Sequence, residues 1–191
     1  ILARVPGDRL SEKDRSAFAV ALEEYVTGQQ AVDDQPGAHL NLGVLYTHLA
    51  RLADAEKEYQ TAVAIDPHFV PARINLAMLY DQRDEKPKAE AQFHAAIGEL
   101  KQQLADTERQ AKANGNAPSS SKAVEPSYVP VFATNATAME RPLERVIEQL
   151  RQQLGETYYS LGLLVAEDEK RLQEAADSLA TAAKLMPANG R

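Results

Sequence analysis

The chain has 191 residues, 44% of them apolar and 26% charged, so it can form one large domain or two small ones. It contains no cysteine, which excludes disulfides, cysteine-ligated metal centres, covalently attached haem and thiol catalysis within this sequence. The formal net charge of −7 argues against a nucleic-acid or anionic-membrane surface. The longest nearly apolar stretch, residues 158–166, is far shorter than the ~20 residues that a membrane-spanning helix needs.

Residues 8–30 are predicted to form a leading helix. Apolar side chains recur on one face at helical spacing: Phe18, Ala21, Leu22 and Tyr25. Ala21, Tyr25 and Gly28 stand 34 residues before a similar triplet in the next segment. This offset predicts the second helix of an incomplete repeat unit, and the alternative is an unrelated capping helix. The chain begins at Ile1 with no signal segment, so we expect it to be a piece of a longer protein.

Two copies of a 34-residue pattern follow, over residues 36–69 and 70–103. Matching residue types recur at this constant offset in six pairs: Leu42 and Leu76, Gly43 and Ala77, Tyr46 and Tyr80, Ala55 and Ala89, Tyr59 and Phe93, Ala62 and Ala96. We expect the small residues to lie where two helices touch and the large ones to fill the space beside them. Each copy therefore predicts two helices joined by a turn, and Pro67 ends the first copy.

Residues 104–154 form an insertion. Two apolar stripes at helical spacing predict an antiparallel hairpin: Phe93, Ile97, Leu100 and Leu104, then Leu143, Ile147, Leu150 and Leu154. Between them, residues 114–138 contain Gly115, three prolines and a serine run, which predict a long loop without regular helix. Four apolar residues of this loop would dock on the protein itself or on a partner: Tyr128, Val129, Val131 and Phe132.

Residues 155–189 are a degenerate third copy. Its spacing matches the first copy at four positions: Ala175, Leu179, Ala182 and Pro187. The distance from Gly162 to Ala175 is one residue longer than in the first copy, which predicts a longer turn. Four apolar residues of its second helix would have no following unit to cover them: Leu179, Ala182, Ala183 and Leu185. We therefore expect that the parent chain continues, or that this face forms a homodimer.

At these positions the sequence resembles the tetratricopeptide repeat family, whose unit is a 34-residue helix–turn–helix. The resemblance implies an all-α fold: a short right-handed helical solenoid with an inserted helical hairpin, forming a single domain over residues 1–191. His39, Arg73 and Tyr158 stand where the family often has tryptophan.

The resemblance also implies a concave groove, lined by the first helix of each unit, that binds a protein or peptide partner. The repeat register predicts these groove residues: Leu40, Asn41, Val44, Thr47, His48, Ile74, Asn75, Met78, Asp81, Tyr159 and Leu163. Leu40, Val44 and Ile74 are apolar where some members of the family clamp a peptide carboxylate, so we expect an amphipathic helix or apolar peptide. Two alternatives remain: the insertion or the leading helix fills the groove, or Asn41 and Asn75 bond neighbouring helices.

No residue pattern indicates catalysis. The four histidines lack metal-ligand spacing, and the chain has no phosphate-binding or nucleophile motif. We expect a module without enzyme activity, cofactor or metal. An enzyme would need a deep polar pocket near His48 or His94.

Residues 15–46 and 65–80 are also similar to C-terminal repeat regions of bacterial multihaem c-type cytochrome proteins. This resemblance implies a structural or oligomerisation appendage of a larger exported redox protein or enzyme. The location would then be periplasmic, and otherwise cytoplasmic. The chain has no C-x-x-C-H motif, so it carries no haem-binding residue.

Overall fold

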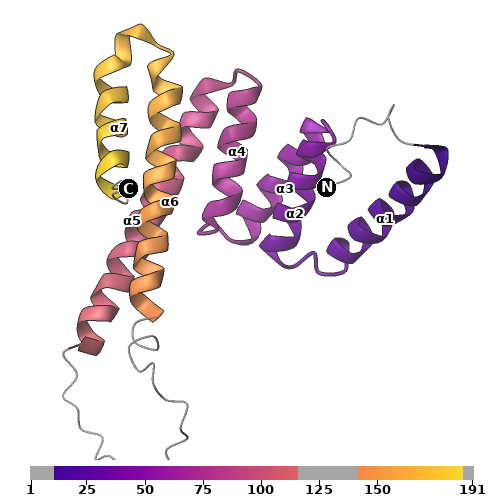
Figure 1. The fold of residues 1–191 in the computed structure, drawn as a ribbon, viewed down its shortest axis with the longest axis horizontal. Helices are drawn as coiled ribbons and strands as arrows, with labels where there is room; N and C mark the ends of the chain where they lie inside the picture. Colours follow the sequence, from indigo (N-terminus) through magenta and orange to yellow (C-terminus); the bar gives the residue numbers. More distant parts are fainter. Residues whose placement is uncertain (1–10, 116–141, 187–191) are drawn as a thin grey trace, which may run out of the picture. The chain divides into compact units, whose positions relative to one another are not determined.

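The computed structural model describes residues 11–115 and 142–186, and within these ranges the regular structure is helical, without strands (Figure 1). The all-α prediction is confirmed. The chain divides into two compact units, residues 1–96 and 97–191, and each is described by itself. None of the helices in the described ranges combines the length and apolar character that crossing a membrane requires.

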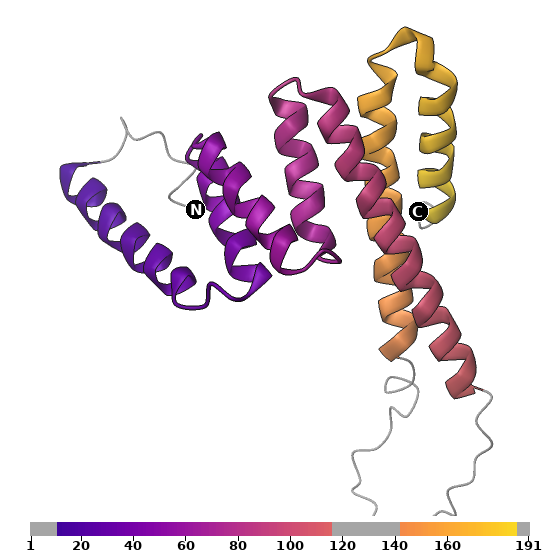
Figure 2. The same cartoon turned by 180° about the vertical axis from the view of Figure 1, so that it is seen from behind.

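The first unit contains α1 (Glu12–Gln30), α2 (Pro36–His48), α3 (Leu52–Ile65), α4 (Val70–Gln82) and the start of α5 (Lys86–Gly115). Figure 2 shows α2, α3 and α4 following one another as antiparallel neighbours. The two helices predicted for each of the first two copies are therefore present. The leading helix begins at Glu12, where Ser11 caps it by accepting a hydrogen bond from the Asp14 amide at 3.1 Å. Residues 8–10 of the predicted helix lie outside the described residues.

The turns inside the two copies have the same backbone geometry. Ala50 and Asp84, 34 residues apart, both adopt left-handed backbone conformations, with φ of 57° and 59°. In each turn the following amide bonds a carbonyl five residues back: Arg51 to Tyr46 and Glu85 to Tyr80, both at 2.8 Å. This is the Schellman pattern, which satisfies the last carbonyls of a helix and reverses the chain. Glycine usually holds the left-handed position, so the sequence carries no obvious signal for these two turns.

Helix contact inside the first copy follows the predicted alternation of small and large residues. A Cβ added to Gly43 would lie only 2.4 Å from the Tyr59 ring, so α2 and α3 approach where the glycine leaves room. Ala55 and Ala62 are 0% exposed, as are Ala77 and Ala89 of the second copy. The close approach buries Tyr59 to 2% exposure and makes it a central part of the core.

The second unit contains the rest of α5, then α6 (Pro142–Ala166), a short 3-10 helix η4 (Glu169–Arg171) and α7 (Leu172–Leu185). Arg151 of α6 donates to Glu108 of α5 at 2.8 Å, and the Lys101 ammonium lies 5.3 Å from the Tyr158 ring centre. Later residues of α5 thus meet earlier residues of α6, which confirms the predicted antiparallel hairpin. The helix of the insertion runs without a break into the third copy, because α6 spans both.

The third copy reproduces the helix contact of the first. A Cβ added to Gly162 would lie 2.8 Å from Leu179, the position equivalent to Tyr59. The turn from α6 to α7 contains η4, in agreement with the longer turn that the spacing predicts. The prediction that Leu179 and Ala182 lack cover is wrong: Leu179 packs on Gly162, and Ala182 is 2% exposed. Both side chains face α6, and Ala183 is exposed.

The predicted loop over residues 114–138 begins slightly too early, because α5 continues through Gly115. Residues 116–141, including the apolar segment that we expected to dock, lie outside the described residues.

Candidate functional site

A groove of about 330 Å³ opens in the first unit between α2 and α4, with α3 beneath it. The chain contributes eight lining residues: Val44, Thr47, His48, Tyr59, Asn75, Met78, Leu79 and Gln82. Five of these are among the predicted groove residues. Leu79 and Tyr59 were not predicted, because their spacing indicated core positions.

The walls of the groove repeat with the 34-residue period. Val44 of α2 and Met78 of α4 are equivalent, as are His48 and Gln82. Because the two copies place equivalent residues at the same helix position, the two walls each present an apolar side chain followed by a polar one, one turn later. Met78 is 56% exposed and is therefore accessible to a ligand without rearrangement of the core.

Tyr59 reaches the floor of the groove from the core. The Thr47 hydroxyl donates to the Gly43 carbonyl at 2.9 Å, and the Tyr59 hydroxyl lies 3.1 Å from the same Thr47 oxygen. Since Thr47 uses its proton on the carbonyl, the Tyr59 hydroxyl is the donor to Thr47. Burial raises the pKa of Tyr59, with the Thr47 hydrogen bond acting in the opposite direction. The phenol is therefore protonated, and this pair fixes the floor.

Other predicted groove residues lie elsewhere. The Asn41 amide donates to Gln29 of α1 at 3.0 Å, so it bonds a neighbouring helix, as the alternative for this residue predicted. The Asp81 carboxylate is paired with Lys86 at 2.6 Å. Leu40 and Ile74 are half-buried and do not line the groove.

The two predicted residues of the third copy lie on α6 in the second unit. Tyr159 is 51% exposed and Leu163 is 49% exposed. Leu163 is the residue equivalent to Val44 and Met78, so an apolar side chain occupies this position in all three copies. It is a partly exposed position in each of them.

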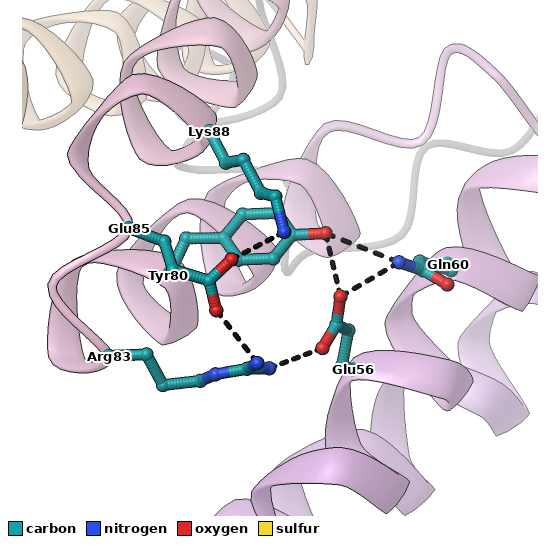
Figure 3. A network of polar contacts seen from close by, with 6 residues as sticks. All are labelled: Glu56, Gln60, Tyr80, Arg83, Glu85 and Lys88. Atoms are coloured by element: carbon teal, nitrogen blue, oxygen red, sulfur yellow. Dashed lines mark hydrogen bonds and ion pairs between the residues drawn. The ribbon is translucent and has the colours of Figure 1, made fainter.

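A polar network joins the two copies behind the groove (Figure 3). The Tyr80 hydroxyl donates to Glu56 at 3.0 Å and lies 3.2 Å from the Gln60 amide nitrogen, which donates to it. Arg83 bonds Glu56 and also pairs with Glu85 at 2.7 Å. The network links α3 of the first copy to α4 and its following turn, so it holds the second wall of the groove against the first copy.

Lysine 88 completes this network. It bonds Glu85, and its ammonium lies 5.1 Å from the centre of the Tyr80 ring. The hydrogen bond to Lys88 lowers the pKa of Glu85, and the same bond raises the pKa of Lys88. Burial is the main cause that raises the pKa of Tyr80. These groups are in their ordinary charged or neutral states at neutral pH, which suits a structural role.

A second polar link recurs with the repeat period. His39 of α2 contacts Glu58 at 2.6 Å and the Asp33 carbonyl at 2.8 Å. Arg73, the equivalent residue of α4, donates to the Pro67 carbonyl at 2.8 Å and to Gln92 at 3.4 Å. Both pairs of partners are also 34 residues apart. Where the family often has tryptophan, this chain therefore uses polar links between its helices.

Residues 36–69 match the family model of the tetratricopeptide repeat. The predicted repeat is confirmed for this segment. No curated protein matches the sequence. Neither this match nor the solved structures named below supports the resemblance to multihaem cytochromes.

Solved structures similar to this chain include three helical repeat proteins. YrrB, described as a TPR protein with an unusual peptide-binding site, is 13% identical, with a TM-score of 0.38 over 86% of this chain and 76% of that one. MamA is 16% identical, with a TM-score of 0.41 over 91% of each chain. The APC/C hetero-tetramer Cut9–Hcn1 is 13% identical, with a TM-score of 0.34 over 81% of this chain and 26% of that one.

Proposed function

We propose that the first unit is a protein-interaction module that binds an amphipathic helix or an apolar peptide segment in the groove between α2 and α4. Tetratricopeptide repeats stack helix pairs and present concave surfaces to protein partners. The observation that carries the proposal is the groove itself, with exposed Met78 on one wall and its equivalent Val44 on the other.

The lining chemistry suits an apolar side chain attached to a peptide backbone. Val44, Met78 and Leu79 offer apolar surface, which gains about 25 cal/mol per Å² on burial, before ordering costs. The flexible thioether of Met78 can adapt its shape to different side chains. Asn75 and Gln82 offer amide donors and acceptors for the backbone of the peptide. No lysine or arginine is among the residues that line this groove, so an apolar anchor suits it better than a terminal carboxylate.

The test uses peptides selected from a displayed library of amphipathic sequences against the full chain. The variant Met78→Asp places a charge in the groove at a position already 56% exposed, so the core is undisturbed. We expect it to weaken binding of the selected peptides by at least about tenfold, which corresponds to about 1.4 kcal/mol. Leu40 and Ile74 are unsuitable for this test, because they are half-buried and a charge there would affect folding.

Leu172→Asp is the matched control. Leu172 is 55% exposed, nearly the same as Met78, but lies at the start of α7 in the second unit. It should leave peptide affinity unchanged. Equal affinity of Met78→Asp and the unmodified chain for every selected peptide would overturn the groove proposal.

A further inference from the structure

The helix α1 exposes a face that resembles the inner face of a packed helix. In the repeat register, Ala21, Tyr25 and Gly28 are equivalent to Ala55, Tyr59 and Ala62 of α3. Tyr59 is 2% exposed and the two alanines are 0% exposed, because α2 packs on them. By contrast, Tyr25 is 44% exposed, Ala21 is also exposed, and a Cβ added to Gly28 would have nothing within 4 Å.

Contact with α2 uses a different face of α1. Leu22, Val26 and Gln29 are half-buried, and Gln29 accepts the hydrogen bond from Asn41 of α2. Residues at 22, 26 and 29 occupy one side of the helix, and residues at 21, 25 and 28 lie on the adjacent side. The docking of α1 on α2 therefore leaves the Tyr25 side open.

Helix pairs elsewhere in this chain bring a glycine opposite a large side chain. Gly43 lies against Tyr59 and Gly162 against Leu179. The open face of α1 carries large and small residues in alternation: Phe18, Ala21, Tyr25 and Gly28. Their spacings of three, four and three residues are symmetric about the midpoint of the series. Two such helices placed antiparallel would oppose Tyr25 with Ala21 of the second copy, and Phe18 with Gly28 of the second copy.

The charges at the two ends of α1 favour the same orientation. Lys13 and Arg15 are exposed in its first turn, and Asp33 and Asp34 are exposed just after its last. An antiparallel pair brings the basic end of one helix beside the acidic end of the other, whereas a parallel pair would place like charges together. The helix dipoles also oppose each other favourably when the helices are antiparallel.

We infer that a second copy of this chain docks antiparallel on the open face of α1, through Phe18, Ala21, Tyr25 and Gly28, and forms a homodimer. This interface is separate from the groove and does not depend on its function. A single helix pair buries less surface than the roughly 1,200 Å² of a stable interface, so the association is weak and concentration-dependent.

The test measures the mass of the full chain by light scattering over a range of about 10 µM to 1 mM, which covers weak association. We expect the mass to rise from 20.9 kDa towards twice that value. Tyr25→Ala removes the large side chains, and Ala21→Tyr places two tyrosines opposite each other, so each should weaken association by about tenfold or more. The double variant A21Y/Y25A exchanges the two positions in both copies and should restore association.

Circular dichroism of each variant checks that the helices remain, and both substituted positions are exposed in the single chain. Val20→Ala is the control, since Val20 is 54% exposed but outside the stripe, and it should leave association unchanged. A mass of one chain at all concentrations would overturn the inference. A dimer that survives Tyr25→Ala would also overturn it, since another face would then hold the copies together.

Discussion

The close approach of α2 and α3 at Gly43 leads to a prediction that separates packing from helix propensity. In an ordinary helix interior, replacing glycine by alanine stabilises the helix by about 1 kcal/mol. At Gly43 the new Cβ would lie 2.4 Å from Cε1 and 2.5 Å from Cδ1 of Tyr59, well inside contact distance. The ring cannot move away freely, because it is 2% exposed and its hydroxyl bonds Thr47.

Forcing an extra carbon into such a site costs about 1–3 kcal/mol. Gly43→Ala should therefore lose all or more of the propensity gain. Gly98→Ala supplies the comparison, since Gly98 lies in the interior of α5 and a Cβ there meets nothing within 4 Å. It should gain about 1 kcal/mol. Urea unfolding followed by circular dichroism measures both variants, and equal stabilisation by the two would refute the packing account of Gly43.

Three further predictions concern the turns, the network and alkaline pH. Ala50→Gly should stabilise the first unit by about 0.5–1 kcal/mol in urea unfolding, because φ is 57° there and a left-handed conformation costs a non-glycine residue about 1–2 kcal/mol; Ala53→Gly, in the helical interior of α3, should instead destabilise it by about 1 kcal/mol, and the same sign for both would contradict the turn assignment. Tyr80→Phe should cost about 1 kcal/mol, because it removes the hydroxyl from the network, whereas Tyr46→Phe, 34 residues earlier, removes a hydroxyl to which the described structure assigns no hydrogen bond and should be nearly neutral; equal losses would argue against the network. The folded-state pKa of both Tyr59 and Tyr80 is raised above the ordinary value of 10.0, so their contribution to stability is complete below pH 10.0 and lost as pH rises through the raised values; unfolding free energies measured at increasing alkaline pH should fall less steeply for Tyr80→Phe than for the unmodified chain, and parallel curves would be the contrary result.

The repeat register predicts much of the fold because one physical requirement recurs at a fixed spacing. Two helices of a pair can approach closely only where a small residue faces a large one. Gly43 with Tyr59 and Gly162 with Leu179 meet this requirement in the structure. The same register predicts which residues of α2 and α4 share the groove, since equivalent residues have equivalent positions on their helices.

The parts that the sequence does not predict depend on contacts between side chains of different helices. Asn41 faces the expected side of α2, but its amide is taken by Gln29 of α1. The docking angle of α1 decides this contact, and spacing along the chain does not encode that angle. Tyr59 belongs both to the core and to the floor of the groove, and a repeat pattern assigns each residue only one role. Ala50 adopts a left-handed conformation without a glycine signal, because the Schellman bonds around it stabilise the turn.

The central claim is that the groove between α2 and α4 receives an apolar segment of a protein partner. The chain contains three methionines, and two of them are in the described residues: Met78 on the groove wall and Met186 in the second unit. Met186 lies close to Gly155 of α6, so its methyl reports on the second unit. The most direct measurement is a titration of methyl-labelled methionine with a library-selected amphipathic peptide, followed by NMR. Our account predicts that the Met78 methyl resonance shifts with peptide concentration while that of Met186 stays in place. A saturable binding curve that leaves the Met78 resonance unmoved would contradict it.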